Sequence, residues 1–504
     1  MTQDQYDIII IGSGMGGLVC GDVLSREGYS VCILEKNKQI GGCLQTYVRD
    51  RVIFDSGVHY LGGLDKGQNL YQVFKYLGIM DKLRLQRMER DVFDKIITEN
   101  DEKEYVFAQG YENFIRKLLV DFPDQEKALR LYCDKIKEVC NRFPLYNLRA
   151  GGGFSEKAEV MEIDTRAYIE SITDDSKLQA VLVGNNMLYA GQAGKTPFYV
   201  HAMILNSYIE SSWKCINGGS QIGKLMARNI QGRGSIIKRN CTVKKIVVED
   251  GKVSHVTIAG DDRIYGKFFI SNIHPVKTLE ITNTAVIKNA FRNRLKSLEN
   301  SISNFTVNII FKDNAFKYFQ HNYYYFKAGR VWTMADYTEE DWPLGYVIFL
   351  GAGKTKEYAE SMTILAYMRY AEVKQWENTF NTVSETDDRG SDYDVFKKYK
   401  AEKLIDCVEE KFPGLRDSIK TYYTATPLSY RDYIGNDDGS MYGIVKDHRD
   451  PIKTLISPRT KLPNLYFTGQ NLNLHGILGA AMSGLVTCID LMGNESIIEK
   501  IKNA

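Results

Sequence analysis

The N-terminal part of the chain follows a fixed order of hydrophobic patterns. Ile8–Ile11 is an unbroken run of β-branched residues, which is typical of a parallel strand buried on both faces. After a glycine-rich turn, apolar residues repeat at the spacing of one helical face, at Leu18, Val19, Val23 and Leu24. Val31–Leu34 is a second short apolar run. The pattern predicts a strand, a helix and a strand, which together make a βαβ unit.

The C-terminal part of the chain predicts a similar unit. Leu465–Thr468 has the pattern of a strand, and after a polar loop apolar residues repeat every four positions, at Ile477, Ala481, Leu485 and Ile489. Residues 232–275 alternate short β-rich runs with turns, which indicates a small antiparallel meander. Residues 111–140 and 395–412 have helical patterns. These elements predict an α/β fold with a second, α+β domain.

Composition and charge exclude several classes of protein. The 504 residues suffice for roughly two to four folding units. Lysine plus arginine (65) and aspartate plus glutamate (63) nearly cancel, so we expect no nucleic-acid partner. Nine cysteines without a C-x-x-C pair predict free thiols in a reducing compartment. Because the sequence has neither a signal-peptide pattern nor an apolar run of spanning length, we expect a cytoplasmic protein, with peripheral membrane contact as an option.

The glycine turn has the spacing G-x-G-x-x-G, which is typical of dinucleotide sites. Gly12 permits a tight turn, Gly14 lets a pyrophosphate approach the backbone, and Gly17 lets the helix pack close to the strand. Glu35 ends the second strand, where it can accept hydrogen bonds from an adenosine ribose. The motif is a weak signal alone, and an ordinary α/β turn is the alternative. Strand, helix, strand and acid in register favour the dinucleotide site.

A second glycine turn indicates which dinucleotide is bound. Gly41 and Gly42 follow Glu35 closely, and Phe54–Gly57 follows them, an order that keeps the backbone near the cofactor and that an NAD enzyme does not need. This extension resembles the FAD-binding domain shared by flavin amine oxidases and carotenoid desaturases. The resemblance implies non-covalent FAD, since no attachment cysteine lies beside the flavin motif. It also implies that the C-terminal helix points its N-terminus at the flavin ring.

The resemblance becomes more specific along the chain. The segments "GGCLQTY", "FDSGVHYLGGL", "TPLSYRDYIGNDDGSMYGI", "SPRT" and "NLYFTGQNLNLHGILGA" are similar to the retinol saturase and carotenoid isomerase branch of the phytoene desaturase family. Gly42 and Cys43 together with His59 and Tyr60 are most similar to the retinol saturases. One departure is His475, because many carotenoid desaturases have proline there, which puts the pocket shape near the flavin in doubt.

The resemblance implies a Rossmann-like, discontinuous FAD-binding domain of the flavin amine oxidase and phytoene desaturase type, with an inserted substrate domain. Expected boundaries are 1–84, 215–285 and 421–504 for the FAD domain, and 85–214 and 286–420 for the substrate domain. The strand around Cys241 to Val247 is expected to return to the first βαβ unit, with Val243 against adenine. The expected FAD-binding residues are Gly12, Gly14, Met15, Gly16, Gly17, Glu35, Lys36, Gly42, Cys43, Thr46, Gly57, Val58, His59, Val243, Gly469, Gln470, Gly476 and Ile477.

The resemblance further implies an oxidoreductase acting on carbon–carbon bonds of an apolar isoprenoid or polyene lipid, by reduction, desaturation or isomerisation. The electron donor or acceptor stays open. The aromatic segment 316–329 can line a tunnel for such a substrate, although ordinary core packing is the favoured explanation for any single ring there. Hydride chemistry needs a proton partner, and the candidates are His59, Tyr60, His475 and Tyr430. The other five histidines are expected to be structural or surface residues, and no spacing predicts a metal site.

Two other functions remain open at this point. A flavin amine oxidase would share the FAD domain but would need a cage for an amine. A binding protein with purely structural FAD is the second alternative. Turnover of amines with peroxide release would favour the first, and inertness of the flavin toward every alkene would favour the second.

Overall fold

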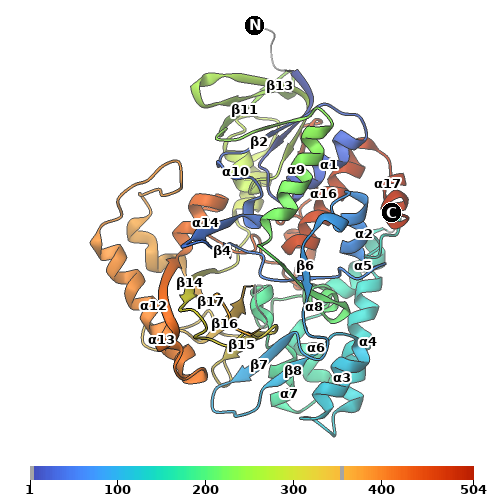
Figure 1. Cartoon of the computed structure of the whole chain (residues 1–504). Coiled ribbons are helices and arrows are strands. Elements are labelled where there is room, and N and C mark those ends of the chain that lie inside the picture. Colours follow the sequence, from blue (N-terminus) through green and yellow to red (C-terminus); the bar gives the residue numbers. More distant parts are fainter. Residues whose placement is uncertain (1–4, 152, 352–356) are drawn as a thin grey trace.

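The computed structural model describes residues 5–151, 153–351 and 357–504. In this part of the chain two seven-stranded sheets dominate the architecture, and a two-stranded and a three-stranded sheet accompany them. Figure 1 shows the first large sheet at the top, beside the N-terminus, and the second toward the bottom. The two halves of the molecule therefore have separate sheets and separate hydrophobic cores.

The first sheet contains the predicted βαβ unit. β1 (Gln5–Ile11) pairs in parallel with both β2 (Val31–Leu34) and β13 (Arg263–Ser271), which buries its isoleucines. α1 (Met15–Arg26) connects β1 to β2, and α16 (Gly476–Met492) follows β19 (Leu465–Phe467), so both predicted units are confirmed. The spatial order of strands is β10 (Ile236–Lys238), β2, β1, β13, β12 (Lys252–Ile258) and β11 (Val243–Glu249), with β19 beside β13.

Three helices pack closely beside this sheet because their contact faces carry small residues. A Cβ atom on Gly484 of α16 would lie 3.0 Å from the carbonyl oxygen of Gly16 in α1. On the other side of α1, a Cβ atom on Gly21 would lie 3.1 Å from Ile230 of α9 (Ser220–Gly232). The thin face of α16 therefore places the start of α1 directly beside the middle of α16.

One strand prediction is wrong. The strand that returns to the first βαβ unit is β10, which pairs in parallel with β2, whereas β11 forms the far edge of the sheet. β10 has only three residues, so the longer run of β11 has the stronger pattern. The segment between β10 and β11 still reaches the first βαβ unit, because the Cys241 amide donates a hydrogen bond to the Glu35 carbonyl oxygen at 2.8 Å. The antiparallel meander is confirmed for β11, β12 and β13.

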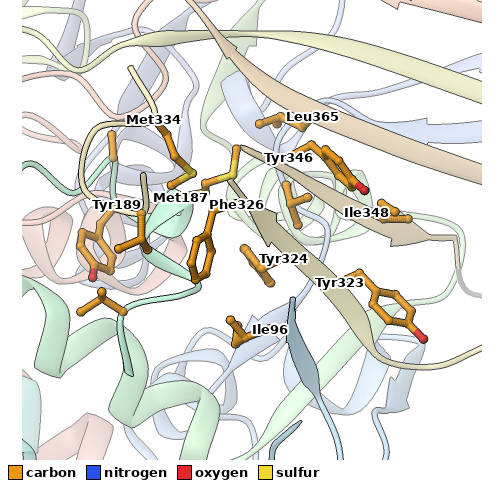
Figure 2. Close-up of a cluster of buried hydrophobic side chains, with 14 of the residues drawn as sticks. Ile96, Met187, Tyr189, Tyr323, Tyr324, Phe326, Met334, Tyr346, Ile348 and Leu365 are labelled. Atoms are coloured by element: carbon orange, nitrogen blue, oxygen red, sulfur yellow. The ribbon is translucent and has the colours of Figure 1, made fainter. Parts of the chain in front are cut away.

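The second sheet pairs distant parts of the chain. Its order is β18 (Ile419–Ala425), β14 (Ser303–Phe311), β17 (Ser361–Met368), β16 (Gly345–Leu350), β15 (Asn322–Phe326), β7 (Asp94–Thr98) and β8 (Tyr105–Phe107). β7 and β15 pair in parallel, with Asp94 opposite Asn322. Side chains of β15 alternate between two faces, and Figure 2 shows Tyr323 and Tyr324 on opposite sides of their strand.

Helices cover both faces of the second sheet. α12 (Ser391–Lys411) and the residue after it, Phe412, pack on the face that carries Tyr323 and Tyr346. The opposite face, with Tyr324, faces the cavity described below. The predicted helical region 111–140 consists of two helices, α3 (Tyr111–Leu119) and α4 (Glu126–Asn141), and α4 packs against α8 (Phe198–Glu210).

The remaining elements connect and cover these layers. The strands are β3 (Thr46–Arg49), β4 (Val52–Asp55), β5 (Leu61–Gly62), β6 (Leu85–Arg87) and β9 (Ser212–Cys215). The helices are α2 (Asn69–Tyr76), α5 (Phe154–Met161), α6 (Thr165–Ile172), α7 (Ser176–Leu182), α10 (Pro275–Glu280), α11 (Asn289–Lys296), α13 (Leu415–Ser418), α14 (Pro427–Ile434), α15 (Pro451–Thr454) and α17 (Ser496–Lys502). No helix of the described residues is both long and apolar enough to cross a membrane. The expected domain boundaries stay a prediction.

Candidate cofactor and substrate site

A cavity of about 470 Å³ extends from the first glycine turn to the second sheet. Gly12, Glu35 and Val243 line it in the first half of the molecule, and Tyr208 and Leu365 line it in the second half. A smaller cavity of about 70 Å³ adjoins it, because both share His59, Tyr60, Tyr208 and Leu365 in their linings. The site therefore has one end at the dinucleotide motif and another among apolar and aromatic side chains.

The backbone segments at the glycine-rich end pack closely on one another because glycines stand at their contacts. A Cβ atom on Gly14 would lie 2.8 Å from the Asn272 side chain, and one on Gly16 would lie 2.8 Å from Gly469. The second turn packs on the first, since a Cβ atom on Gly42 would lie 3.2 Å from the Gly14 Cα. Gly42 also has a positive φ of 57°. Both glycine turns and the loop after β19 thus form one cradle.

Two helices begin at this cradle without a side-chain cap. Gly14 is the N-cap of α1 and has no side chain, and the side chain of His475, the N-cap of α16, accepts no hydrogen bond from the first turn of that helix. The first residues of both helices, Met15 and Gly476, line the cavity. Backbone N–H groups and the positive end of the helix dipole favour bound phosphate or other negative charge. The cradle and the two helix ends therefore fit a dinucleotide with an extended ring system.

Glu35 is held rigidly at the end of β2. Its carboxylate accepts hydrogen bonds from the Ser13 amide (3.0 Å), the Ser13 hydroxyl (2.5 Å) and the Asn37 amide (2.8 Å). The side chain is buried but still borders the cavity. Glu35 thus fastens the glycine turn and faces the place where a ribose is expected.

The structure brings nearly all expected cofactor residues to this cavity. Gly17 and Thr46 are the exceptions. A Cβ atom on Gly17 would lie 2.3 Å from the Gly12 carbonyl oxygen, so Gly17 serves the close packing of α1 on the turn. The Thr46 hydroxyl donates a hydrogen bond to Ser220. The others line the cavity: Gly12, Gly14, Met15, Gly16, Glu35, Lys36, Gly42, Cys43, Gly57, Val58, His59, Val243, Gly469, Gln470, Gly476 and Ile477.

All four candidate proton partners line the same cavity. The His59 ring stacks on Phe349 with 4.3 Å between the centroids, and burial, assisted by the nearby Lys214 charge, lowers its pKa to about 4. His475 shares a hydrogen bond of 3.0 Å with the Leu188 carbonyl oxygen, and burial lowers its pKa to about 4 as well. Both rings are therefore neutral at pH 7. Burial raises the pKa of Tyr430 to about 12.

Tyr60 belongs to a buried polar cluster at the far end of the cavity. Its hydroxyl donates to the Asp94 carboxylate at 3.0 Å and lies 2.8 Å from the Tyr324 hydroxyl. The Asn185 and Asn322 amides also donate to Asp94. Figure 2 shows Tyr324 among buried side chains such as Ile96 and Phe326. Of the four candidates, Tyr60 alone contacts a carboxyl group.

Sequence reasoning missed several lining residues. Asn272, directly after β13, lies between the first glycine turn and Gly469, and its place after a parallel strand was a usable signal. His274, expected to be structural or on the surface, lines the cavity and also caps α10 by accepting from the Val276 amide. Asp94 and Tyr324 carry no local motif. Only long-range pairing brings them together, so no sequence signal could identify them.

The remaining chemistry of the site concerns its thiols, possible metal ligands and hydrogen-bond donors. All nine cysteines are free, and Cys43 borders the cavity with a thiol whose pKa burial raises to about 11. Among the described residues, no cluster of three His, Cys, Asp or Glu side chains could hold a metal ion. The donors at the cavity include backbone amides, neutral side chains and the lysines Lys36 and Lys277. These features define a dinucleotide-dependent enzyme with an apolar substrate chamber.

Comparisons with known proteins agree with this class. The model of the NAD(P)-binding Rossmann-like domain matches residues 10–77. Wild-type putrescine oxidase, solved with putrescine bound, has the same fold, with a TM-score of 0.63 at 14% identity over 97% of this chain and 99% of that one. The fold is therefore of the flavin amine oxidase type, and residues 10–77 match a Rossmann-like dinucleotide-binding domain.

The relatives found by sequence form a narrower group than the proteins that share the fold. The all-trans-retinol 13,14-reductase of Danio rerio is 24% identical, covering 98% of this chain and 87% of the relative. The chloroplastic prolycopene isomerase of Daucus carota is 24% identical, covering 96% of this chain and 79% of the relative. The chain is thus similar over nearly its whole length to these reductases and isomerases, which confirms the predicted resemblance.

Proposed function

We propose that the protein binds FAD non-covalently and uses it to transfer hydride to a carbon–carbon double bond of an apolar isoprenoid lipid. The cofactor domain would be 1–84, 215–285 and 421–504, with the substrate domain formed by 85–214 and 286–420. Glu35 and Lys36 would border the adenosine, and the start of α1 would face the pyrophosphate. The start of α16 would face the flavin ring. The protonated Cys43 thiol favours non-covalent binding.

The observation that carries the proposal is the continuity of the cavity. One space connects the glycine cradle to a chamber bordered by Leu188, Met203, Ile204, Tyr208 and Leu365. Such walls suit an apolar chain and exclude water from the reacting carbons. When bound, FAD supplies a hydride donor and acceptor; the protein binds and orients the lipid and provides the proton. Relatives that act on retinol and prolycopene support a polyene substrate.

Reduction is the direction that we favour, because the motif containing His59 and Tyr60 is most similar to the reductase branch. The electron donor is outside the proposal. Amine oxidation is the alternative, supported by the shared fold of putrescine oxidase. Among the described residues, the two cavity linings contain one carboxylate, Glu35, which hydrogen bonds from Ser13 and Asn37 already engage, and the buried Asp94 lies outside both linings. We therefore rank amine oxidation second.

The test uses anaerobic stopped-flow spectroscopy of the flavin from both redox states. Reduced enzyme mixed with all-trans-retinol should be reoxidised if the protein is a reductase. Oxidised enzyme would instead be reduced by a more saturated lipid in a desaturase. Product without net change in the flavin indicates isomerisation. Reduction by putrescine or another amine, with no response to any polyene, would refute the proposal.

The cofactor is tested separately. Purified protein should be yellow, and acid precipitation should release FAD into the supernatant. Colourless protein that takes up no added FAD would contradict the cofactor assignment.

A further inference from the structure

The Asp94 carboxyl group is an unusual feature of the second half of the molecule. It is completely buried, and it is the first residue of β7, where it lies opposite Asn322 of β15. Its hydrogen-bond partners are the amides of Asn185 (3.2 Å) and Asn322 (2.9 Å) and the Tyr60 hydroxyl (3.0 Å). None of these three partners carries a positive charge. A buried carboxylate without a bonded cation is costly, so the site shifts Asp94 toward the protonated form relative to an exposed aspartate.

The cluster has a direct path to the substrate chamber. Oδ2 of Asp94 contacts the Tyr60 hydroxyl, which lies 2.8 Å from the Tyr324 hydroxyl. Tyr60 and Tyr324 both line the small cavity, and Tyr60 also lines the large one. Asp94 itself lines neither cavity. Two phenol groups therefore connect a buried carboxyl group to the chamber wall.

The direction of these hydrogen bonds depends on the proton. When Asp94 is ionised, Tyr60 donates to the carboxylate and Tyr324 can donate to Tyr60, so both phenol protons point away from the chamber. When Asp94 is protonated, its O–H can donate to Tyr60, and Tyr60 can donate to Tyr324. The Tyr324 proton is then free to point into the chamber.

We propose that Asp94 holds a proton and delivers it through Tyr60 and Tyr324 to a substrate carbon in the small cavity. The inference rests on the proposed reduction of a carbon–carbon double bond. That reaction breaks a π bond and forms two C–H bonds, one with the hydride of reduced flavin and one with a proton. The Tyr324 O–H bond breaks, Tyr60 reprotonates Tyr324, and Asp94 reprotonates Tyr60. Asp94 is left as carboxylate and takes a proton from solvent while an external two-electron donor reduces the flavin again.

The charges around Asp94 fit this role. Burial raises the pKa of Asp94 to about 6. The hydrogen bonds that Asp94 accepts and the charge of Lys214 act in the opposite direction and lower this pKa. Lys214 lies in β9 and donates its own hydrogen bond to the Leu350 carbonyl oxygen. The titratable groups that face Asp94 are Tyr60, Tyr208 and Tyr324, which are neutral at pH 7, and Lys214. His59, which is neutral and stacked on Phe349, is a poorer proton source.

Infrared titration of the FAD-loaded protein tests the proton on Asp94 without turnover. The parent should show a protonated carboxyl band that disappears as the pH rises through about 6 and that is absent from Asp94→Asn. Asp55→Asn is the matched control: Asp55 is a second carboxyl group of raised pKa, hydrogen-bonded to the Gly219 amide outside the cluster. That variant should keep the Asp94 band. If Asp94→Asn removes no protonated band, the inference is wrong.

Delivery is tested by the pH profile of flavin reoxidation after mixing reduced enzyme with retinol. The parent rate should fall as the pH rises through about 6, because the ionised form has no proton to give. Asp94→Asn and Tyr324→Phe should each be about 10- to 100-fold slower, and the Asp94→Asn profile should be flat. An unchanged profile and rate in Asp94→Asn would overturn the inference and leave the proposed function intact. If no lipid reoxidises the parent, the proposed function fails, and the infrared band still decides whether Asp94 holds the proton.

Discussion

At the scale of single residues, Glu35 shows how one side chain serves structure and binding together. Its carboxylate fastens Ser13 in the glycine turn and still borders the cavity. Replacing it removes the support of the glycine turn and, on the proposed function, a hydrogen-bond acceptor for the cofactor ribose.

We predict that Glu35→Ala weakens FAD affinity by about 1.5–3 kcal/mol, the usual effect of losing a charge-assisted hydrogen bond. Glu35→Gln keeps an acceptor oxygen and should lose less. Fluorescence titration of the apoprotein with FAD gives both values. Equal affinities in the parent and Glu35→Ala would mean that the ribose is recognised elsewhere.

Tyr60 and His59 are neighbours in sequence but differ in their surroundings. Tyr60→Phe keeps the stack on Tyr208 while losing the hydroxyl that contacts Asp94, so we predict about 100-fold slower flavin reoxidation with FAD still bound. His59→Phe keeps a ring beside Phe349, and we expect a loss below about 10-fold. Stopped-flow rates of the two variants provide the comparison. A larger loss in His59→Phe would assign the proton to the histidine.

Asp94 also makes stability depend on pH. Because its pKa is about 6 in the folded protein, against an ordinary value of 3.8, the folded state binds the proton more tightly than the unfolded chain. This group's contribution to stability therefore falls as the pH rises from about 4 to about 6. At about 1.4 kcal/mol per pKa unit, the loss is on the order of 3 kcal/mol.

Asp94→Asn cannot ionise, so its stability relative to the parent should rise between about pH 4 and about pH 7. Urea unfolding of the parent and the variant at both pH values measures this change. Asp101→Asn should show the opposite sign in a lower window, between about pH 2 and about pH 4, because hydrogen bonds from Lys177 and Tyr105 lower the pKa of Asp101 to about 2 although burial opposes them. Parallel pH profiles for the parent and Asp94→Asn would show that Asp94 is ionised throughout.

At the scale of elements, the close approach of α1 to the turn before it decides whether a dinucleotide fits. A Cβ atom on Gly17 would meet the Gly12 carbonyl oxygen at 2.3 Å, and backbone cannot move aside cheaply. We predict that Gly17→Ala destabilises the protein by about 1–3 kcal/mol and abolishes FAD binding.

Gly232→Ala is the matched control for that substitution, because a Cβ atom on Gly232, the last residue of α9, meets nothing within 4 Å. It should bind FAD like the parent and unfold at the same temperature or slightly above. Normal FAD binding by Gly17→Ala would mean that α1 does not need this contact.

The elements also show what a sequence can reveal. β1, α1, β2 and α16 were predictable because each has a hydrophobic period, a glycine turn or both within a few residues. The pairing of β10 with β2 was not, since three residues are too short for a pattern. α12 begins at Ser391, earlier than its apolar pattern suggests, after the left-handed Gly390.

At the scale of the whole molecule, the active chamber exists only where the two halves meet. Sequence motifs identified the cofactor end, because glycines and Glu35 act within one local unit. The substrate end depends on β7 pairing with β15, residues more than 200 positions apart, and on Tyr60 reaching both. Long-range contacts of this kind leave no periodicity in the sequence, so the proton-holding cluster could not be predicted.

The central claim is that this chamber holds an apolar polyene beside a flavin that reduces it. The most direct measurement is an anaerobic single turnover: dithionite-reduced, desalted enzyme is mixed with all-trans-retinol, and the lipid extract is analysed by mass spectrometry while flavin absorbance is recorded. We predict a product heavier by two hydrogen atoms, in an amount equal to the flavin reoxidised. Recovery of unchanged retinol with the flavin still reduced, together with reduction of the oxidised enzyme by an amine, would contradict the account.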